Sequence, residues 1–315
     1  MKLTDRAMRD IYGDLLIAYA KQYPNLVILD ADLRKAINLQ PFANAYPERA
    51  INVGVAEANM IGVAAGLANM GKIPFTHTFT PFASRRVFDQ VTLSVAYAGL
   101  PVKMVGSDPG IMAQLNGGTH MCLEDLALMR SLPGMVIVEP VDGVQLAGLF
   151  DAILTCPHPV YLRLIRQDFD PIFPEGTTFE LGKVSLVEDG EDVTVFASGI
   201  MVKEALDARD MLAKEGVSVQ VINVHTLKPL DVEGVVEAAK KTGAVVTCDN
   251  HNIIGGLGSA VAETLGEHVP VPMQRVGVKD HFGEVGKKPF LMEKFGLTAT
   301  HVAQAVRDVL VRKNT

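Results

Sequence analysis

Short apolar runs alternate with segments that repeat apolar residues at helical spacing along most of the chain. Residues 25–30, NLVILD, form a compact apolar run that ends in an acid, which is typical of a buried strand. Residues 5–22 place Ile11, Leu15 and Tyr19 on one stripe, which predicts an amphipathic helix. In the first half of the chain we predict further strands at 72–75, 101–107, 135–138 and 160–164, and further helices at 55–71, 82–98, 123–130 and 143–155.

A break in this pattern divides the chain into two parts. Residues 167–178, QDFDPIFPEGTT, hold two prolines and show no periodicity, so they read as a linker. A length of 315 residues also suits two domains. After the break we predict strands at 193–197, 217–223, 244–248 and 271–276, and helices at 201–214, 231–240, 258–265 and 300–311.

The alternation of strands and helices predicts the fold class. Strands that alternate with helices favour a mostly parallel sheet with helices on both faces. We therefore predict an α/β protein with two domains of this kind, at residues 1–170 and 186–315, joined by a linker over residues 171–185.

Composition narrows the classes of function. Hydrophobic residues make up 48% of the chain and the net charge is -7, so neither nucleic acid nor an anionic membrane is expected as a partner. The three cysteines are widely spaced, and the charged N-terminus lacks the apolar core of a signal peptide. No run of about 18 uncharged apolar residues is present. We expect a cytoplasmic protein whose mean hydropathy of +0.22 reflects a large core and a buried subunit surface.

One carboxylate stands out in the predicted helix over residues 55–71. Glu57 is the only charged residue between Ala50 and Gly71, in a stretch made mainly of small and apolar side chains. Burial of an unpaired carboxylate is costly. Glu57 therefore has a partner in this chain, receives one from outside, or is an ordinary glutamate favoured by the helix dipole.

A glycine-rich loop and two aromatic residues lie near predicted strand ends. Residues 108–120, DPGIMAQLNGGTH, are too long for a turn, and loops of this length are often functional. His120 closes the loop after glycines that would let a ligand approach the backbone, although a structural histidine is the alternative. Phe79 and Phe82 flank Pro81, and they either belong to the core or present ring faces to a flat ligand.

Other polar residues lie near predicted strand or helix ends, where ligands bind in open α/β folds. Four of them are charged, and for each of these a surface salt bridge is the alternative to a role in ligand binding. They are Arg9, Asp32, Arg163 and Arg166. His251 follows a predicted strand, and a structural role is the commoner one for such a histidine. The sequence IGGLGS at residues 254–259 could bind a phosphate, but it departs from the dinucleotide pattern, so we favour tight packing of a loop on a helix.

Six motifs occur in order along the chain. They are NVGVAEANM at residues 52–60, TFTPF at 78–82, NGGTH at 116–120, RLIRQ at 163–167, HTLKPLD at 225–231 and GGLGSAV at 255–261. Taken together, these motifs resemble transketolase, in its pyrimidine-binding domain followed by its small C-terminal domain, over nearly the whole chain. Deoxyxylulose-phosphate synthases and pyruvate-dehydrogenase-type β subunits share much of the same set.

The resemblance implies a cofactor, thiamine diphosphate, and residues that bind it. Glu57 would contact a pyrimidine nitrogen and, by sharing a proton with it, favour the tautomer that activates the cofactor. Phe79 and Phe82 would pack on the pyrimidine ring. Asp32 would line the cofactor pocket.

The resemblance also implies substrate-binding residues. His120 would act in catalysis by facing the substrate oxygens. Arg9 and Arg166 would hold a sugar phosphate, because a guanidinium can bind phosphate through two parallel hydrogen bonds. Asp108 would lie in the substrate site as well.

Three positions depart from the family pattern. Asp108 lies in a Ser-Asp-Pro sequence, where the family usually has a histidine in a Thr-His-Asp sequence. Ala36 occupies the position of a serine that contacts the substrate in the family. Asn116 occupies the position of an aspartate that precedes the motif with His120. These changes affect acceptor and phosphate recognition rather than cofactor activation. The particular sugar therefore stays open.

The half of the site that holds the diphosphate is missing from the resemblance. In the family, a separate domain with a Gly-Asp-Gly motif binds Mg²⁺ and the diphosphate, and the resemblance of this chain does not include that domain. We therefore expect the C-terminal subunit of a split transketolase, which moves a two-carbon ketol unit from a ketose phosphate to an aldose phosphate. Thiamine diphosphate and Mg²⁺ would be bound jointly with an N-terminal partner subunit, Mg²⁺ mainly by that partner, in an α2β2 assembly that contains a homodimer of this chain.

Two other functions stay open at this point. One is the decarboxylation of a 2-oxo acid, as in an oxo-acid dehydrogenase β subunit or a deoxyxylulose-phosphate synthase. The other is a non-catalytic scaffold or regulatory chain. In the isolated chain we expect Glu57 to lie in partly open surroundings, with no side chain of its own subunit paired to it.

Overall fold

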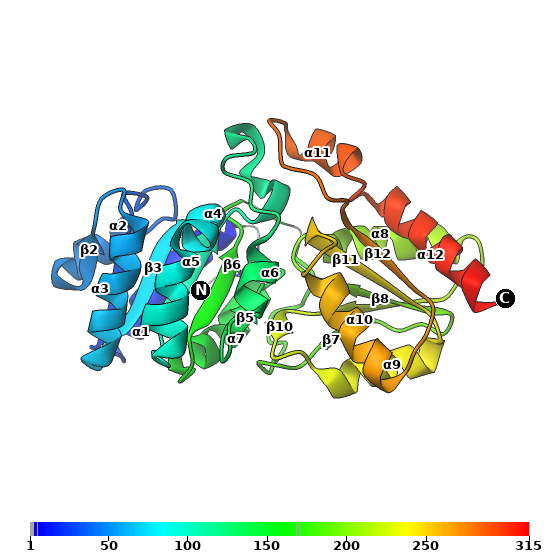
Figure 1. The fold of residues 1–315 in the computed structure, drawn as a ribbon, viewed down its shortest axis with the longest axis horizontal. Helices are drawn as coiled ribbons and strands as arrows, with labels where there is room; N and C mark the ends of the chain where they lie inside the picture. The colour runs from blue at the N-terminus through cyan, green and yellow to red at the C-terminus, as the bar shows by residue number, and fades with distance from the viewer. Residues whose placement is uncertain (1–2, 5, 168, 170, 315) are drawn as a thin grey trace.

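The computed structural model describes residues 3–4, 6–167, 169 and 171–314. Within these residues the chain forms two α/β units placed end to end, each built on its own sheet (Figure 1). The first sheet has seven strands in the order β10-β5-β6-β4-β3-β1-β2, and the second has five in the order β12-β11-β8-β9-β7. Neighbouring strands are parallel except for β10 with β5 and β7 with β9. The predicted fold class, with two mostly parallel sheets, is confirmed.

The first sheet lies in the middle of its unit because most of its strands are buried apolar runs. β1 (Leu26–Asp30), β4 (Lys103–Ser107) and β6 (Val160–Leu164) are buried at every position. β3 (Ile73–Phe79) runs four residues beyond the predicted end at residue 75, because its polar residues are buried and paired with β4. The other strands are β2 (Ala50–Asn52), β5 (Val136–Val138) and β10 (Thr226–Lys228).

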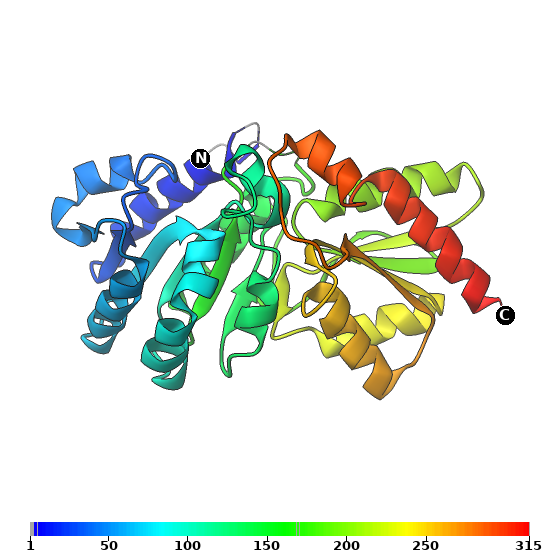
Figure 2. The same ribbon diagram turned by 45° about the horizontal axis from the view of Figure 1, so that its top comes forward.

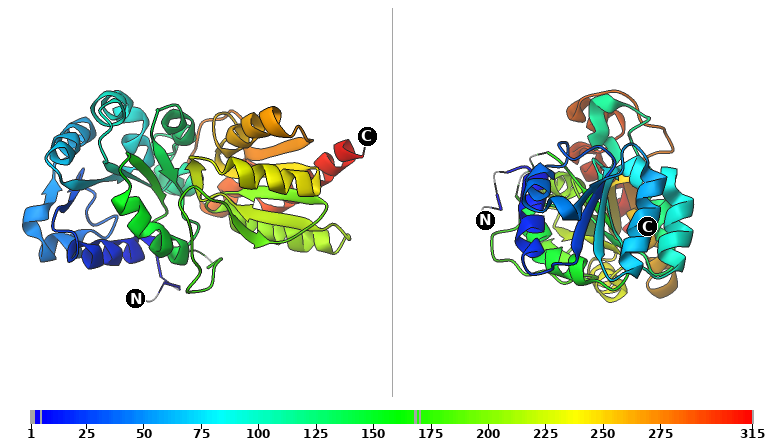
Figure 3. Two further views of the ribbon diagram at one scale, coloured as in Figure 1. Left: turned by 90° about the horizontal axis from the view of Figure 1, so that it is seen from below. Right: turned by 90° about the vertical axis from the view of Figure 1, so that its left-hand side faces the viewer.

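Helices cover both faces of the first sheet, as the turned views make clear (Figures 2 and 3). One face packs against α1 (Met8–Ala20), α2 (Gln40–Ala45) and α7 (Gly143–Thr155). The other face packs against α3 (Glu57–Asn69), the segment 80–97 and α6 (Asp125–Arg130).

The segment 80–97 differs from the single helix predicted over residues 82–98. Ser84 has φ -121° and ψ -90°, outside the helical region, and its hydroxyl donates to the carbonyl oxygen of Thr80 at 2.6 Å. A bond from a serine hydroxyl to the carbonyl oxygen four residues earlier is known to bend helices, and the chain turns here. The segment consists of α4 (Thr80–Ala83), η2 (Arg85–Val87), α5 (Phe88–Gln90) and η3 (Val91–Tyr97).

The second unit has the same layered plan. Its α8 (Met201–Ala213) and α12 (Ala299–Lys313) pack together on one face of the sheet, and α9 (Val232–Thr242) and α10 (Leu257–His268) cover the other. α9 begins as predicted, because the Asp231 side chain accepts from the backbone N–H of Gly234 at 3.2 Å. The remaining elements are β7 (Ser185–Glu188), β8 (Val193–Ala197), β9 (Val219–Asn223), β11 (Val245–Asn252), β12 (Met273–Val278) and α11 (Lys288–Lys294).

A buried arginine and a strand from the second half of the chain that pairs with the first sheet join the two units. β10 comes from the second half of the chain and pairs with β5 of the first sheet. Arg163, fully buried on β6, donates to Asp125 and Glu139 at 2.8 and 2.9 Å and to the carbonyl oxygen of Asn250 in β11 at 3.1 Å. The surface salt bridge considered for Arg163 is therefore wrong, because the residue lies in the contact between the units.

The connection between the units follows β6 and has little regular structure. β6 ends at Leu164 and β7 begins at Ser185. The backbone N–H groups of Ile172 and Phe173 donate to the Asp142 carboxylate at 2.9 and 2.8 Å, which fixes this part of the connection against the first unit. Residues 168 and 170 lie outside the described residues.

Candidate active site

The carboxyl ends of four neighbouring strands meet at one edge of the first sheet. β6, β4, β3 and β1 are consecutive in the sheet and parallel, so their ends lie side by side. Asp32 follows β1, Phe79 ends β3, Asp108 follows β4 and Arg166 follows β6. The strand order thus gathers predicted residues that are far apart in the sequence.

Glu57 is held by an arginine of its own chain. The glutamate is only 4% exposed, and Nη1 of Arg86 donates to both of its carboxylate oxygens at 3.0 Å. The expectation of an unpaired Glu57 in partly open surroundings is therefore wrong. The turn at Ser84 explains the error, because it places the short η2 segment beside the start of α3, within reach of Glu57.

The same arginine covers an aromatic ring. Its guanidinium carbon lies 3.8 Å from the centroid of the Phe82 ring. Phe82 in turn contacts His120 edge-on at 5.2 Å between centroids, and Phe79 contacts His120 at 5.8 Å. We call Phe79, Phe82 and His120 the aromatic cluster. The structure thus brings four predicted residues together, because Glu57 and Phe82 contact the guanidinium of Arg86 and the other two members of the cluster contact Phe82.

The loop that carries His120 is fixed by the second unit. Gly118 packs so closely on the segment before α11 that a Cβ atom there would lie 2.3 Å from the carbonyl oxygen of Gly283. Figures 1 and 2 show this segment beside the loop at the top of the molecule. The Thr119 hydroxyl lies 2.9 Å from Nδ1 of His120. The glycines therefore permit a close backbone contact that sets where His120 lies.

Arg166 and Asp108 form an ion pair beside the aromatic cluster. Nε of Arg166 donates to Oδ2 of Asp108 at 2.6 Å, and Nη2 contacts the same oxygen. The Arg166 guanidinium lies 5.0 Å from the centroid of the Phe79 ring. Two of the four predicted substrate-binding residues therefore lie next to the cluster, paired with each other.

Arg9 and Asp32 border the site from the β1 side. Nη1 of Arg9 donates to the carbonyl oxygen of Ala36 at 3.3 Å, and Asp32 accepts from the side chain of Asn52 at 3.1 Å. Asp32, Ala36 and Asn52 also line a cavity of about 460 Å³. This side of the edge has room for a ligand.

Two residues of the site were not predicted from the sequence. Arg86 follows the TFTPF motif closely, and the need of Glu57 for a cation was the signal that pointed to it. Gln114 has a strained φ of 47°, donates to Gln167 at 2.9 Å, and accepts from the backbone of Lys288 at 3.2 Å. No sequence pattern marked Gln114, because its role depends on contacts between distant segments.

Other candidates lie away from the strand ends. His251 is fully buried in the contact between the units, where Nδ1 lies 2.7 Å from the carbonyl oxygen of Asn252. A Cβ at Gly255 would lie 2.4 Å from the side chain of Ala127 in α6, so the loop over residues 254–259 packs on a helix as we favoured.

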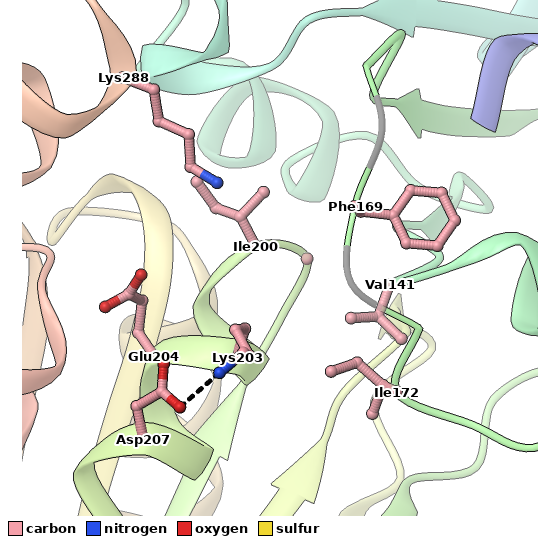
Figure 4. Close-up of a pocket in the computed structure, with 9 residues that line it drawn as sticks. Val141, Phe169, Ile172, Ile200, Lys203, Glu204, Asp207 and Lys288 are labelled. Atoms are coloured by element: carbon pink, nitrogen blue, oxygen red, sulfur yellow. Dashed lines mark hydrogen bonds and ion pairs between the residues drawn. The ribbon is translucent and has the colours of Figure 1, made fainter. Parts of the chain in front are cut away.

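A further cavity, of about 430 Å³, lies between the two units (Figure 4). Lys203 and Asp207 pair with each other on one side of it, and Val141 and Ile172 lie on the other. None of the predicted site residues lines this cavity, so we place the candidate active site at the strand ends. Its full lining is Val141, Phe169, Ile172, Gly199, Ile200, Lys203, Glu204, Asp207 and Lys288.

The described residues lack two kinds of feature. They hold no group of three or more histidine, cysteine, aspartate or glutamate side chains placed to bind a metal ion. They also hold no helix with the length and apolar character needed to cross a membrane.

Comparison with known proteins gives the family. The description "Transketolase, pyrimidine binding domain" matches residues 4–171, and "Transketolase, C-terminal domain" matches residues 182–302. This chain belongs to the transketolase family. The transketolase family implies the use of thiamine diphosphate, which agrees with the resemblance found in the motifs.

Individual relatives match the chain over nearly its whole length. It is 60% identical over 314 residues to the 6-deoxy-6-sulfo-D-fructose transketolase subunit SqwH of Clostridium sp. strain MSTE9, with 100% of this chain and 98% of that protein covered. It is 35% identical to one subunit of the apulose-4-phosphate transketolase of Phocaeicola vulgatus, with 92% and 93% covered. A solved structure described as "Split gene transketolase, inactive beta4 tetramer" is 44% identical, with a TM-score of 0.90 and 98% and 99% covered. The chain thus corresponds to one subunit of a split transketolase.

Proposed function

We propose that this chain, together with a partner subunit, transfers a two-carbon ketol unit from an anionic ketose to an aldose phosphate. The observation that carries the proposal is that the carboxylate of Glu57 and the ring of Phe82, which contacts His120, both lie against the guanidinium of Arg86. Membership of the transketolase family and the similarity to named transketolase subunits support the same reaction.

The surroundings of Glu57 fit an aminopyrimidine ring. Arg86 places a flat N–C–N group over Phe82 and donates N–H groups to both carboxylate oxygens. An aminopyrimidine also presents a flat ring and an edge of nitrogen atoms, so it could use the same ring face and the same carboxylate. The guanidinium of Arg86 and an aminopyrimidine ring cannot both occupy the space between Glu57 and the Phe82 ring. The Arg86 side chain is 45% exposed, and we infer that it moves aside when the cofactor binds.

The residues of the chain would then act on the cofactor and the substrate. When bound, thiamine diphosphate supplies an electron sink that lets the bond between C2 and C3 of a ketose break. Glu57 would hold a proton against a pyrimidine nitrogen, and Phe79 and Phe82 would fix the plane of that ring. Because Nδ1 of His120 is engaged by the Thr119 hydroxyl, Nε2 is the atom left to bind a substrate oxygen and exchange a proton with it.

The proposed reaction is balanced without an oxidant or reductant. The C2–C3 bond of the donor breaks, and the C1–C2 unit forms a new carbon–carbon bond to the carbonyl carbon of the acceptor. The donor leaves as an aldose two carbons shorter, and the acceptor becomes a ketose two carbons longer.

A partner subunit would bring the residues that hold Mg²⁺ and the diphosphate. The surface around α3 supports such a contact, because Val55 just before the helix and Met70 just after it are 75% and 80% exposed. On the neighbouring η3, Leu93 and Tyr97 are 57% and 89% exposed. Exposed apolar side chains gathered in this way are typical of an interface. We propose that the N-terminal subunit and a second copy of this chain cover them in an α2β2 assembly.

The donor would carry a terminal acidic group that binds near Arg166 and Arg9. Those two guanidinium groups lie at the strand ends, at the rim of the site. The names of the two relatives above state sugars with a sulfonate in one case and a phosphate in the other. A ketose with either terminal group is therefore a candidate donor.

Reconstitution tests the proposed function. The chain is mixed with the N-terminal subunit, thiamine diphosphate and Mg²⁺, and two-carbon transfer to D-glyceraldehyde 3-phosphate is followed by mass spectrometry. We expect transfer in the mixture and none from either chain alone. Release of carbon dioxide from pyruvate without ketol transfer would instead favour a decarboxylating enzyme.

A further inference from the structure

The arginines around the strand ends are each in contact with an acid of the same chain. Their positive charges are therefore largely balanced before any substrate arrives. The pairs are Arg9 with Asp10 at 3.7 Å, Arg34 with Asp30 at 2.9 Å, Arg86 with Glu57 at 3.0 Å, and Arg166 with Asp108 at 2.6 Å.

Asp108 is the most firmly held of these acids at the proposed substrate site. It is 2% exposed and has a φ of 53°, and its backbone N–H donates to the carbonyl oxygen of Leu164 at 3.0 Å. Its Oδ1 also accepts from the backbone N–H of Arg166 at 3.3 Å. The carboxylate is thus bound through both backbone and side chain, and it stays beside Arg166 when a ligand binds.

This pairing uses up one edge of the Arg166 guanidinium. Nε and Nη2 both contact Oδ2 of Asp108, so one of the two guanidinium edges that can bind a tetrahedral anion through two parallel bonds is occupied. The Nη1 side of the guanidinium is the part left for a substrate anion. An anion bound there has the Asp108 carboxylate on the other side of the same guanidinium.

The charge of the substrate anion then matters. A phosphate monoester carries about −1.5 to −2 charges at pH 7, because its second pKa is about 6. A sulfonate carries one negative charge throughout this range. Repulsion by Asp108 grows with the charge of the anion, so it opposes a phosphate more than a sulfonate of the same size.

We propose that Asp108 makes the site selective for a ketose with a singly charged terminal group, a sulfonate, over the corresponding phosphate. The inference rests on the proposed function, because it takes ketol transfer as the reaction and Arg166 as a substrate ligand. It goes further by naming the class of donor and the residue that selects it.

The test compares two donors that share one sugar. The reconstituted complex with thiamine diphosphate and Mg²⁺ is assayed with 6-deoxy-6-sulfo-D-fructose and with D-fructose 6-phosphate, and kcat/KM is measured for each. We expect the wild-type ratio to favour the sulfonate, and Asp108→Asn to shift it toward the phosphate by about tenfold. Asp14→Asn is the control. It also removes one negative charge from an arginine–aspartate pair, the pair of Asp14 in α1 with Arg6, and it should leave the ratio of the two kcat/KM values unchanged.

Each outcome decides the matter. A wild-type complex that prefers the phosphate overturns the inference whether or not the variant folds. A loss of kcat/KM by the same factor for both donors in Asp108→Asn also overturns it, because this is what a purely structural role predicts. Transfer from neither donor, nor from an uncharged ketose, would instead refute the proposed function on which the inference rests.

Discussion

Replacing Arg86 tests whether Glu57 is a buried carboxylate that needs a cation. Arg86→Met keeps the long apolar stem but removes both hydrogen bonds to Glu57 and the guanidinium over Phe82. Removing one partner of a fully buried ion pair costs about 3–5 kcal/mol. Arg86 is 45% exposed, so water can replace part of what is lost, and we expect a loss of about 1–3 kcal/mol.

The assay is urea unfolding of the isolated chain, followed by circular dichroism, in a double-mutant cycle with Glu57→Gln. The neutral amide removes the need for a cation, so Arg86→Met should cost at least about 1 kcal/mol less in the Glu57→Gln background. Arg307→Met serves as the control, since its pair with Glu215 is exposed and should contribute below about 1 kcal/mol.

Two results would refute this reasoning. A coupling energy indistinguishable from zero would mean that Glu57 does not depend on Arg86. Weaker binding of thiamine diphosphate by the Arg86→Met complex would mean that Arg86 is a cofactor ligand rather than a group that the pyrimidine displaces.

Two further predictions concern Asp249, a buried acid of β11, and the contact that positions the His120 loop. Burial raises the pKa of Asp249 to about 7, so between pH 4 and 7 the folded chain keeps a proton that the unfolded chain loses, and stability falls as the pH rises through this window. Asp249→Asn should remove that fall, and urea unfolding from pH 5 to 8 would contradict the prediction if the two profiles stay parallel. Gly118→Ala would force the His120 loop away from Gly283, and we expect kcat for ketol transfer to fall by about tenfold or more with unchanged far-UV circular dichroism; undiminished kcat would show that the second unit does not position His120.

The sequence was sufficient for the fold class because strand and helix periods are local. Runs such as 25–30 and 143–155 contain their own signal, and the structure has β1 and α7 there. Short elements were missed because three to seven residues repeat a period too few times to give a clear pattern. They are α2, β2, β7, β10 and α11. β10 in particular pairs with a strand almost 90 residues earlier, which no local pattern reveals.

The sequence motifs predicted which residues form the site, but the ion pairs between the charged residues of the site were not predicted. The sequence indicated Glu57, the aromatic cluster and Arg166, which parallel strand ends then bring together. It indicated that Glu57 needs a cation, but not that Arg86 supplies it or that Asp108 neutralises Arg166, because ion pairs form between segments whose approach depends on the whole fold. Arg163 shows the same limit, since a residue for which a surface salt bridge was the alternative is fully buried.

The most direct test of the proposed function is ketol transfer by a complex that carries Glu57→Ala. The variant complex is reconstituted with the N-terminal subunit, thiamine diphosphate and Mg²⁺, and its turnover is compared with wild type after circular dichroism has confirmed that the chain is folded. If Glu57 is the proton partner of the cofactor, two-carbon transfer is abolished. Near wild-type turnover would contradict the proposal, because the reaction would then proceed without the carboxylate around which the site is built.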